Sequence, residues 1–200
     1  MNVDWTAFDT IRDPTDKHVM MALALLEIQP ELKKLPRKLR SFCLAHDISS
    51  QSRIISVKKS ATLCSVPPWA LGVGAESTSF EYVLRTVRAT SKHGKRPWFD
   101  YVRLLGVEGV TEVSWYAELR LLFVLGGVDC AFVRWLEVCV PPQDDVLSVY
   151  GCTYLKDVDD GADDKGYYVV KLESIKACEY VNASVIPISS NILNVDNANP

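Results

Sequence analysis

The sequence has no apolar run long enough to cross a membrane. The longest, Val19 to Leu26, is far short of the roughly 20 residues that a transmembrane helix needs. Residues Met1 to Trp5 have neither the basic start nor the apolar centre of a secretion signal. With 48% apolar and 24% charged side chains among 200 residues, the composition excludes a disordered chain, a collagen and a coiled coil. We therefore expect a globular intracellular protein without membrane contact.

The sequence also lacks the motifs of common enzyme classes. Hydrolase, kinase and zincin signatures are absent, and no G-K-[ST] of a phosphate-binding loop follows Gly72 and Gly74. None of the six cysteines forms a C-x-x-C pair, so Cys43 and His46 make at most one half of a zinc site. The acidic run at 157–164 does not match a calcium-binding EF-hand loop. We expect no enzyme activity, no catalytic residues, no bound metal, no cofactor, and reduced thiols.

Charge is distributed unevenly along the chain, although the net charge is only -3. Residues 1–32 hold 2 basic and 6 acidic side chains, a net charge of -4. Residues 33–96 hold 13 basic and 3 acidic side chains, a net charge of +10. Residues 97–200 hold 7 basic and 16 acidic side chains, a net charge of -9. A basic segment of this density can neutralise phosphates and release counterions. It can equally dock on the acidic C-terminal half of the chain, and the sequence leaves both interpretations open.

Two helices are predicted near the N-terminus. Asp13 can cap a helix that runs from about Pro14 to Gln29, where apolar side chains follow helical spacing. A second helical stretch, Glu31 to about Ala45, is expected to kink or split at Pro36, which lacks an amide hydrogen. Its cations form either a solvated basic face or a surface that lies along a phosphate backbone. These cations are Lys33, Lys34, Arg37, Lys38 and Arg40.

From Asp47 onward the apolar period changes from about 3.6 to about 2, which is typical of strands. A basic loop that contains Lys92, Lys95 and Arg96 is a candidate for phosphate contact. The predicted strands are Arg53–Val66 (one or two strands), Ser79–Ala89, Trp98–Leu105, Val113–Leu125, Asp129–Val140, Tyr150–Leu155, Tyr167–Leu172 and Ile175–Tyr180.

The clearest predicted element is a hairpin of the runs Val113–Leu125 and Asp129–Val140. Gly126 and Gly127 lie between them, and glycine supplies the positive φ that tight hairpin turns require. Apolar residues occur on both faces, so we expect this hairpin at the centre of a barrel or sandwich. Strict alternation places five side chains of the first run on one face: Trp115, Ala117, Leu119, Leu121 and Phe123.

Aromatic side chains gather in the β-rich half. They can form a wall that binds methylammonium groups by cation–π attraction, or they can fill the core of a small barrel. One sequence does not separate these interpretations. The candidate wall consists of Trp98, Tyr101, Trp115, Tyr116 and Trp135.

A series of strand motifs in this half resembles bromo-adjacent homology (BAH) domains. That family has a W-x-A-x-I strand, a V-x-V-x-W-F strand and a late V-x-x-I…C-x-V segment. The same region is similar to the β-rich part of proteins encoded by Kyakuja-Dileera-Zisupton type transposons, and the resemblance covers about residues 97–187. The segments that carry it are Phe99–Val102, Trp115–Leu119 with Leu122 and Phe123, Phe132–Leu136, Val169–Ile175 and Glu179–Val181.

The chain departs from the BAH pattern after Trp135. Many BAH domains continue W-F-x-R-P-E, whereas this chain continues Leu136-Glu137-Val138. No ligand cage is therefore transferred residue by residue. The resemblance implies binding to histones, nucleosomes or partner proteins in the nucleus, without catalysis.

Together these observations predict an α+β protein in which an N-terminal helical pair packs on a BAH-like or SH3-like antiparallel β-barrel. We expect a helical segment at 1–48, the barrel domain at 49–188 and a flexible tail at 189–200. The functional hypothesis is a non-enzymatic chromatin or nucleic-acid interaction module of nuclear location, whose basic segment contacts phosphates. The transposon resemblance implies that a transposon-derived protein carries it. The alternative is a protein–protein scaffold of a larger assembly without nucleic-acid contact.

Overall fold

The computed structural model describes residues 1–10, 12–49, 52–65, 83–93, 96–108, 111–139, 154–158 and 166–179. The predicted tail at 189–200 and most of the acidic run at 157–164 lie outside these residues. The helical elements are η1 (Trp5–Phe8), α1 (Lys17–Ile28), η2 (Pro30–Lys34), α2 (Leu35–Ala45) and η5 (Leu172–Ser174). The strands are β1 (Asn2–Asp4), β2 (Ile54–Lys58), β3 (Ser60–Ser65), β4 (Val83–His93), β5 (Arg96–Phe99), β6 (Tyr101–Glu108), β7 (Thr111–Leu125), β8 (Val128–Cys139), β9 (Tyr154–Asp157), β10 (Tyr167–Lys171) and β11 (Ile175–Glu179).

The two predicted helices are present, but α1 begins three residues later than expected. Its cap is Asp16, whose carboxylate accepts hydrogen bonds from the backbone amides of His18 at 2.7 Å and Val19 at 3.3 Å. The carboxylate of Asp13 instead accepts the amide of Thr15 at 2.9 Å and closes a local turn. Asp13 therefore competes with the helix for the backbone rather than starting it.

Proline punctuates the second helical stretch as predicted. Residues Pro30–Lys34 form the 3-10 turn η2, and α2 starts at Leu35 with Pro36 in its first turn. A proline is tolerated there because the first amides of a helix have no intrahelical acceptor.

The predicted central hairpin is formed by β7 and β8. Leu125 pairs with Val128, and the two turn residues Gly126 and Gly127 have φ values of 57° and 84°. Positive φ at both central positions gives the turn a twist that matches the flanking strands. Any other residue at either position would have to hold its backbone in the same left-handed conformation, which is unfavourable when a Cβ atom is present.

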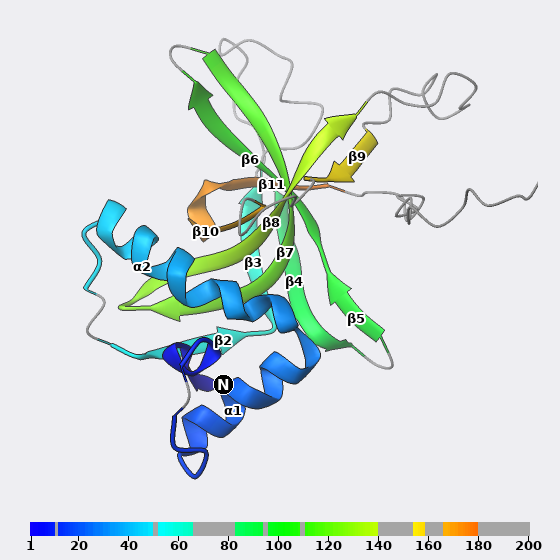
Figure 1. Ribbon diagram of the computed structural model, residues 1–200. Helices are drawn as coiled ribbons and strands as arrows, with labels where there is room; N and C mark the ends of the chain where they lie inside the picture. The colour runs from blue at the N-terminus through cyan, green and yellow to red at the C-terminus, as the bar shows by residue number, and fades with distance from the viewer. Residues whose placement is uncertain are drawn as a thin grey trace, which may run out of the picture.

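The remaining strands pair with different parts of this hairpin (Figure 1). The free edge of β7 pairs first with β6 and then with β2, while the free edge of β8 pairs first with β10 and then with β9. Strand β1 extends the sheet beyond β2, and β11 extends it beyond β6. Strands β3, β4 and β5 form a second antiparallel sheet.

The expected closed barrel is not found among the strands that the structure describes. The path through the main sheet ends at β1 on one side and at β11 on the other. The physical reason is the length of β7 and β8, which exceeds that of their partners. Each long strand takes two short neighbours along one edge, so the sheet branches instead of closing on itself. The α+β class is confirmed.

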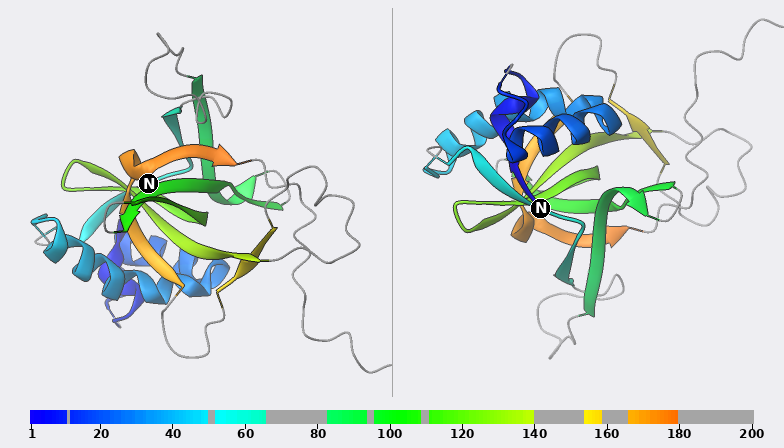
Figure 2. Two further views of the ribbon diagram at one scale, coloured as in Figure 1. Left: turned by 90° about the horizontal axis from the view of Figure 1, so that it is seen from above. Right: turned by 90° about the horizontal axis from the view of Figure 1, so that it is seen from below.

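Three layers enclose two apolar cores. Figure 2 shows the helices on one side of the main sheet and β3 and β4 on the other. The first core lies under the helices and includes Leu35, Leu39 and Phe132. The second lies between the sheets and includes Val87, Leu119 and Val133.

A β-bulge overturns the predicted alternation along β7. The pairing with β8 passes from Leu119 directly to Leu121 and skips Arg120. Leu119 therefore faces the second core, whereas Leu121 and Phe123 face the helices. The expectation that all five side chains share one face was wrong, because one extra residue reverses the phase of a strand.

The first eight residues form an element that the sequence did not reveal. Val3 of β1 pairs with Ile55 of β2, and the turn η1 that follows is buried. Asp4 caps this turn by accepting the amide of Thr6 at 2.9 Å. Segment 1–48 is thus not purely helical, and its core residues belong to the same cluster as those of β7, β8 and β10.

Two leucines of α2 provide a test of the helical layer. Leu39 is fully buried, whereas Leu44 is 88% exposed. Leu39→Ala should lower the free energy of unfolding by about 3 kcal/mol, because it removes buried contacts and leaves a cavity. Leu44→Ala, the matched control on the same helix, should change it by less than about 0.5 kcal/mol. Urea denaturation measures both, and equal effects would contradict the described packing of α2.

Candidate functional site

The predicted basic stretch forms the outer side of η2 and α2. The apolar side chains of the same two elements are buried on the opposite, inner side. Lys33, Arg37 and Arg40 are exposed, and Lys34 and Lys38 are half-buried. The structure therefore brings all five predicted cations to one helical segment, with three of them on the surface.

Two of these lysines lie over tyrosines of β10. The ammonium nitrogen of Lys34 is 4.4 Å from the ring centre of Tyr167, and that of Lys38 is 4.8 Å from the ring centre of Tyr168. Cation–π attraction holds the ammonium groups in place. Because the tyrosine rings are uncharged, these two contacts position positive charge without cancelling it.

Arg40 is held differently. Its Nη1 atom lies 3.2 Å from Oδ2 of Asp9, and its guanidinium lies 5.5 Å from the ring centre of Trp5. The ion pair reduces the net charge at this end of α2. At the other end of the segment, Lys33 and Arg37 are both exposed.

The predicted basic loop is described only in part. The backbone of Lys92 belongs to β4 and that of Arg96 to β5. Lys95 and the side chains of Lys92 and Arg96 lie outside the described residues. The phosphate-binding role of these three residues stays a prediction.

The five predicted wall aromatics do not share one surface. Ala117 belongs to the second core and pairs with Trp135. Trp135 therefore lies on the face of the main sheet that borders the second core, and so does Trp115, two residues before Ala117. Tyr101 and Tyr116 lie on the opposite face. Trp98 stands on β5, where its indole nitrogen donates to Oδ1 of Asp100 and the guanidinium of Arg88 lies 5.4 Å from its ring centre.

Three aromatics do form a continuous row across β7, β8 and β10. The ring centres of Trp115 and Trp135 are 5.6 Å apart at 68°, and those of Trp135 and Tyr168 are 5.5 Å apart at 49°. These are edge-to-face and tilted contacts, in which the rings pack on one another. Trp135 also packs against the second core. Trp115 and Tyr168 are 39% and 41% exposed, so the row covers the rim of the second core, and its edge-to-face and tilted contacts do not turn the ring faces toward one point.

A chain of ion pairs, missed in the sequence analysis, crosses the face of the main sheet that lies under the helices. Glu118 of β7 is buried, and its carboxylate contacts Nη1 of Arg120 at 3.1 Å and Nη2 of Arg134 at 2.7 Å. Arg120 also donates from Nε to Glu31 of η2 at 2.8 Å. Arg134 donates from Nη1 to Asp157 of β9 at 3.1 Å.

The strand register explains how these groups meet. Tyr101, Glu118, Arg134 and Tyr167 are directly opposite one another on β6, β7, β8 and β10. Burial, together with the charge of Glu118, raises the pKa of Tyr101. Burial alone would lower the pKa of Arg134, but the carboxylates of Glu118 and Asp157 outweigh it and raise that pKa.

The charges of this network are matched within it. Two guanidinium groups are matched by three carboxylates, and both oxygens of Glu118 are engaged by arginine. Among the residues that the structure describes, no three His, Cys, Asp or Glu side chains are placed to hold a metal ion. A sequence signal did exist: Glu118 and Arg134 occupy inward positions of two neighbouring predicted strands.

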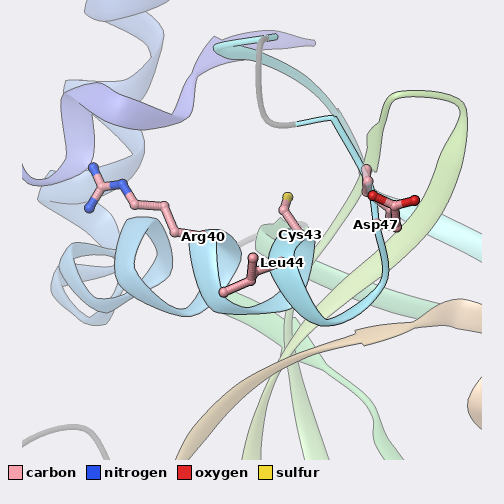
Figure 3. A pocket seen from close by; sticks show the side chains of 5 residues that line it. Arg40, Cys43, Leu44 and Asp47 are labelled. Carbon is pink, nitrogen blue, oxygen red and sulfur yellow. The ribbon is translucent and has the colours of Figure 1, made fainter.

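A shallow pocket of about 360 Å³ lies at the C-terminal end of α2. It is lined by Arg40, Cys43, Leu44, Asp47 and Ile48. Figure 3 shows that the guanidinium of Arg40 points away from Cys43 and Asp47. Burial raises the pKa of the Cys43 thiol, so this cysteine is not an activated nucleophile.

Comparisons with known proteins add no relative. A scan against protein-family models gave no match, and no curated protein or solved structure proved similar. Of the helices in the described part of the chain, none is long and apolar enough to traverse a bilayer.

Neutralising Glu118 should destabilise the protein. Glu118→Gln leaves Arg120 and Arg134 without their shared counter-charge in a partly buried site, and we expect a loss of about 2 kcal/mol in the free energy of unfolding. Glu173→Gln, whose side chain is 77% exposed beside Lys171, is the matched control and should change it by less than about 0.5 kcal/mol. Urea unfolding compares the two variants, and a harmless Glu118→Gln would refute the role of the network.

Thiol reactivity should follow burial. Desolvation is the main reason that the pKa of Cys130 rises to about 12, while Cys64 is exposed. Because the thiolate is the reactive form, a short pulse of iodoacetamide at mildly alkaline pH should alkylate Cys64 and spare Cys130. Peptide mass spectrometry identifies the sites, and urea-unfolded protein should show both modified. Rapid native labelling of Cys130 would contradict its placement in the first core.

Proposed function

We propose that the protein is a non-enzymatic nucleic-acid interaction module, and that η2 and α2 contact the phosphate backbone. The observation that carries this proposal is the concentration of five cations, Lys33 to Arg40, on one helical segment. Lys33, Arg37 and Arg40 are exposed there, Arg40 also pairs with Asp9, and Lys34 and Lys38 lie over tyrosine rings.

The geometry supports backbone contact rather than reading of base sequence. Lysine and arginine on a helix surface neutralise phosphates in any sequence. The basic loop with Lys92, Lys95 and Arg96 would extend the contact in the same manner. We place this activity on chromatin in the nucleus, as the BAH resemblance implies, with DNA as the first ligand to test.

The experiment measures binding of a fluorescent DNA duplex by anisotropy at 50 and 200 mM salt. If three phosphates are neutralised, the logarithmic slope should be about -2.7 and the affinity should fall about 40-fold between these salt concentrations. Lys33→Glu with Arg37→Glu should weaken binding and make the slope shallower by about 2, since each lost phosphate contact removes about 0.9.

The matched control reverses two lysines away from α2. Lys59 follows β2 and Lys176 lies on β11, and both are exposed. Lys59→Glu with Lys176→Glu changes the net charge of the protein by the same amount. Equal weakening by the two double variants, no binding at 50 mM salt, or salt-independent binding would each overturn the proposal.

A further inference from the structure

Helix α1 is apolar on two sides, although it lies at the edge of the molecule (Figure 1). Its inner side packs Val19 and Ala22 into the first core, with Met21, Leu25 and Leu26 partly buried beside them. A surface helix ordinarily carries polar residues on its opposite side. The outer side of α1 instead exposes large apolar groups.

The exposed side of α1 is one continuous stripe. Met20 is 51% exposed, Leu23 38% and Ile28 58%, and Ala24 is exposed between them. Helical spacing of three and four residues places these positions on one face. We call this set, Met20, Leu23, Ala24 and Ile28, the outer stripe.

Opposite charges lie near the two ends of the outer stripe, and the exposed carboxylate of Asp16, which caps α1, adjoins the basic end. Lys17 is the first residue of α1 and Glu27 is its last but one, and both are exposed on the same face. A surface with opposite charges at its two ends complements itself when a second copy lies antiparallel to it. Twofold symmetry requires that kind of self-complementarity.

We infer that the outer stripe of α1 binds a second copy of this chain, with the two helices antiparallel about a twofold axis that passes beside Leu23, level with Ala22 along the helix. In this register Lys17 faces Glu27 of the other copy, and Met20 faces Ala24 of the other copy. One alignment thus pairs both charges and sets a large side chain against a small one. The inference is independent of the proposed function, because it rests on different residues.

The size of the surface predicts a weak dimer. A helix of 12 residues is about 18 Å long, and one pair of such helices buries less than the roughly 1,200 Å² of a standard stable interface. Association should therefore appear at high protein concentration and be in rapid exchange.

The experiment is sedimentation equilibrium of the full chain from micromolar to millimolar concentration. Wild type should show a concentration-dependent dimer. Lys17→Glu and Glu27→Lys should each weaken it about tenfold or more, because each variant places two like-charge pairs across the axis. Both substitutions put the sign that the helix dipole favours at their end of α1, so lost association would not reflect a lost helix.

Mixing the two single variants is the decisive arm. Lys17→Glu in one chain and Glu27→Lys in the other create two attractive pairs in a heterodimer, so the mixture should associate although neither variant does alone. Leu44→Glu, an exposed control on α2, should leave dimerisation intact, whereas Met20→Glu should abolish it. Circular dichroism confirms that every variant is folded.

Several outcomes would overturn the inference. They are a monomeric wild type at every concentration, a mixture that stays monomeric, and a dimer that is indifferent to Met20→Glu. A wild type that is monomeric but floats with anionic phospholipid vesicles would likewise replace the second copy by a membrane surface as the occupant of the outer stripe.

Discussion

Burial of one carboxylate, Glu118, constrains the position of every layer around it. A charge removed from water is costly unless it is paired, and Arg120 and Arg134 supply the opposite charges beside Glu118. Arg120 continues to Glu31 in the helical layer, and its guanidinium lies 4.2 Å from the ring centre of Phe99 in the second sheet. The contacts of one arginine thus join the helices, the main sheet and the second sheet.

The bulge at Arg120 is the structural device that makes this arrangement possible. It inserts one residue into β7 opposite β8 and so turns the strand over halfway along its length. Before the bulge, Leu119 serves the core between the sheets, and after it Leu121 serves the core under the helices. A single long hairpin can therefore contribute to two cores on opposite faces. Because its neighbouring strands are shorter than β7 and β8, the sheet branches.

The helical layer divides its surfaces between packing and contact with other molecules. Helix α2 buries Leu35, Leu39 and Phe42 and leaves its cations outside, which supports the proposed contact with phosphate. Helix α1 buries only its inner side and leaves an apolar outer stripe, which carries the inferred self-association. Both surfaces rest on the first core, so a loss of that core would remove both.

The sequence by itself determined the local structure. Periodicity located both helices and most of the strands, although it joined β5 and β6 into one strand at Trp98–Leu105. Pro36 fixed the break before α2, and Gly126 with Gly127 fixed the hairpin turn, because these signals act over a few residues. It did not reveal the cap at Asp16, the strand at Val3 or the reversal of faces at Arg120. Those depend on which segments meet in space. Only tertiary structure decided that Glu118 and Arg134 pair, that Tyr101 and Trp115 lie on opposite faces, and that the sheet branches, since strand register and partner choice are long-range properties.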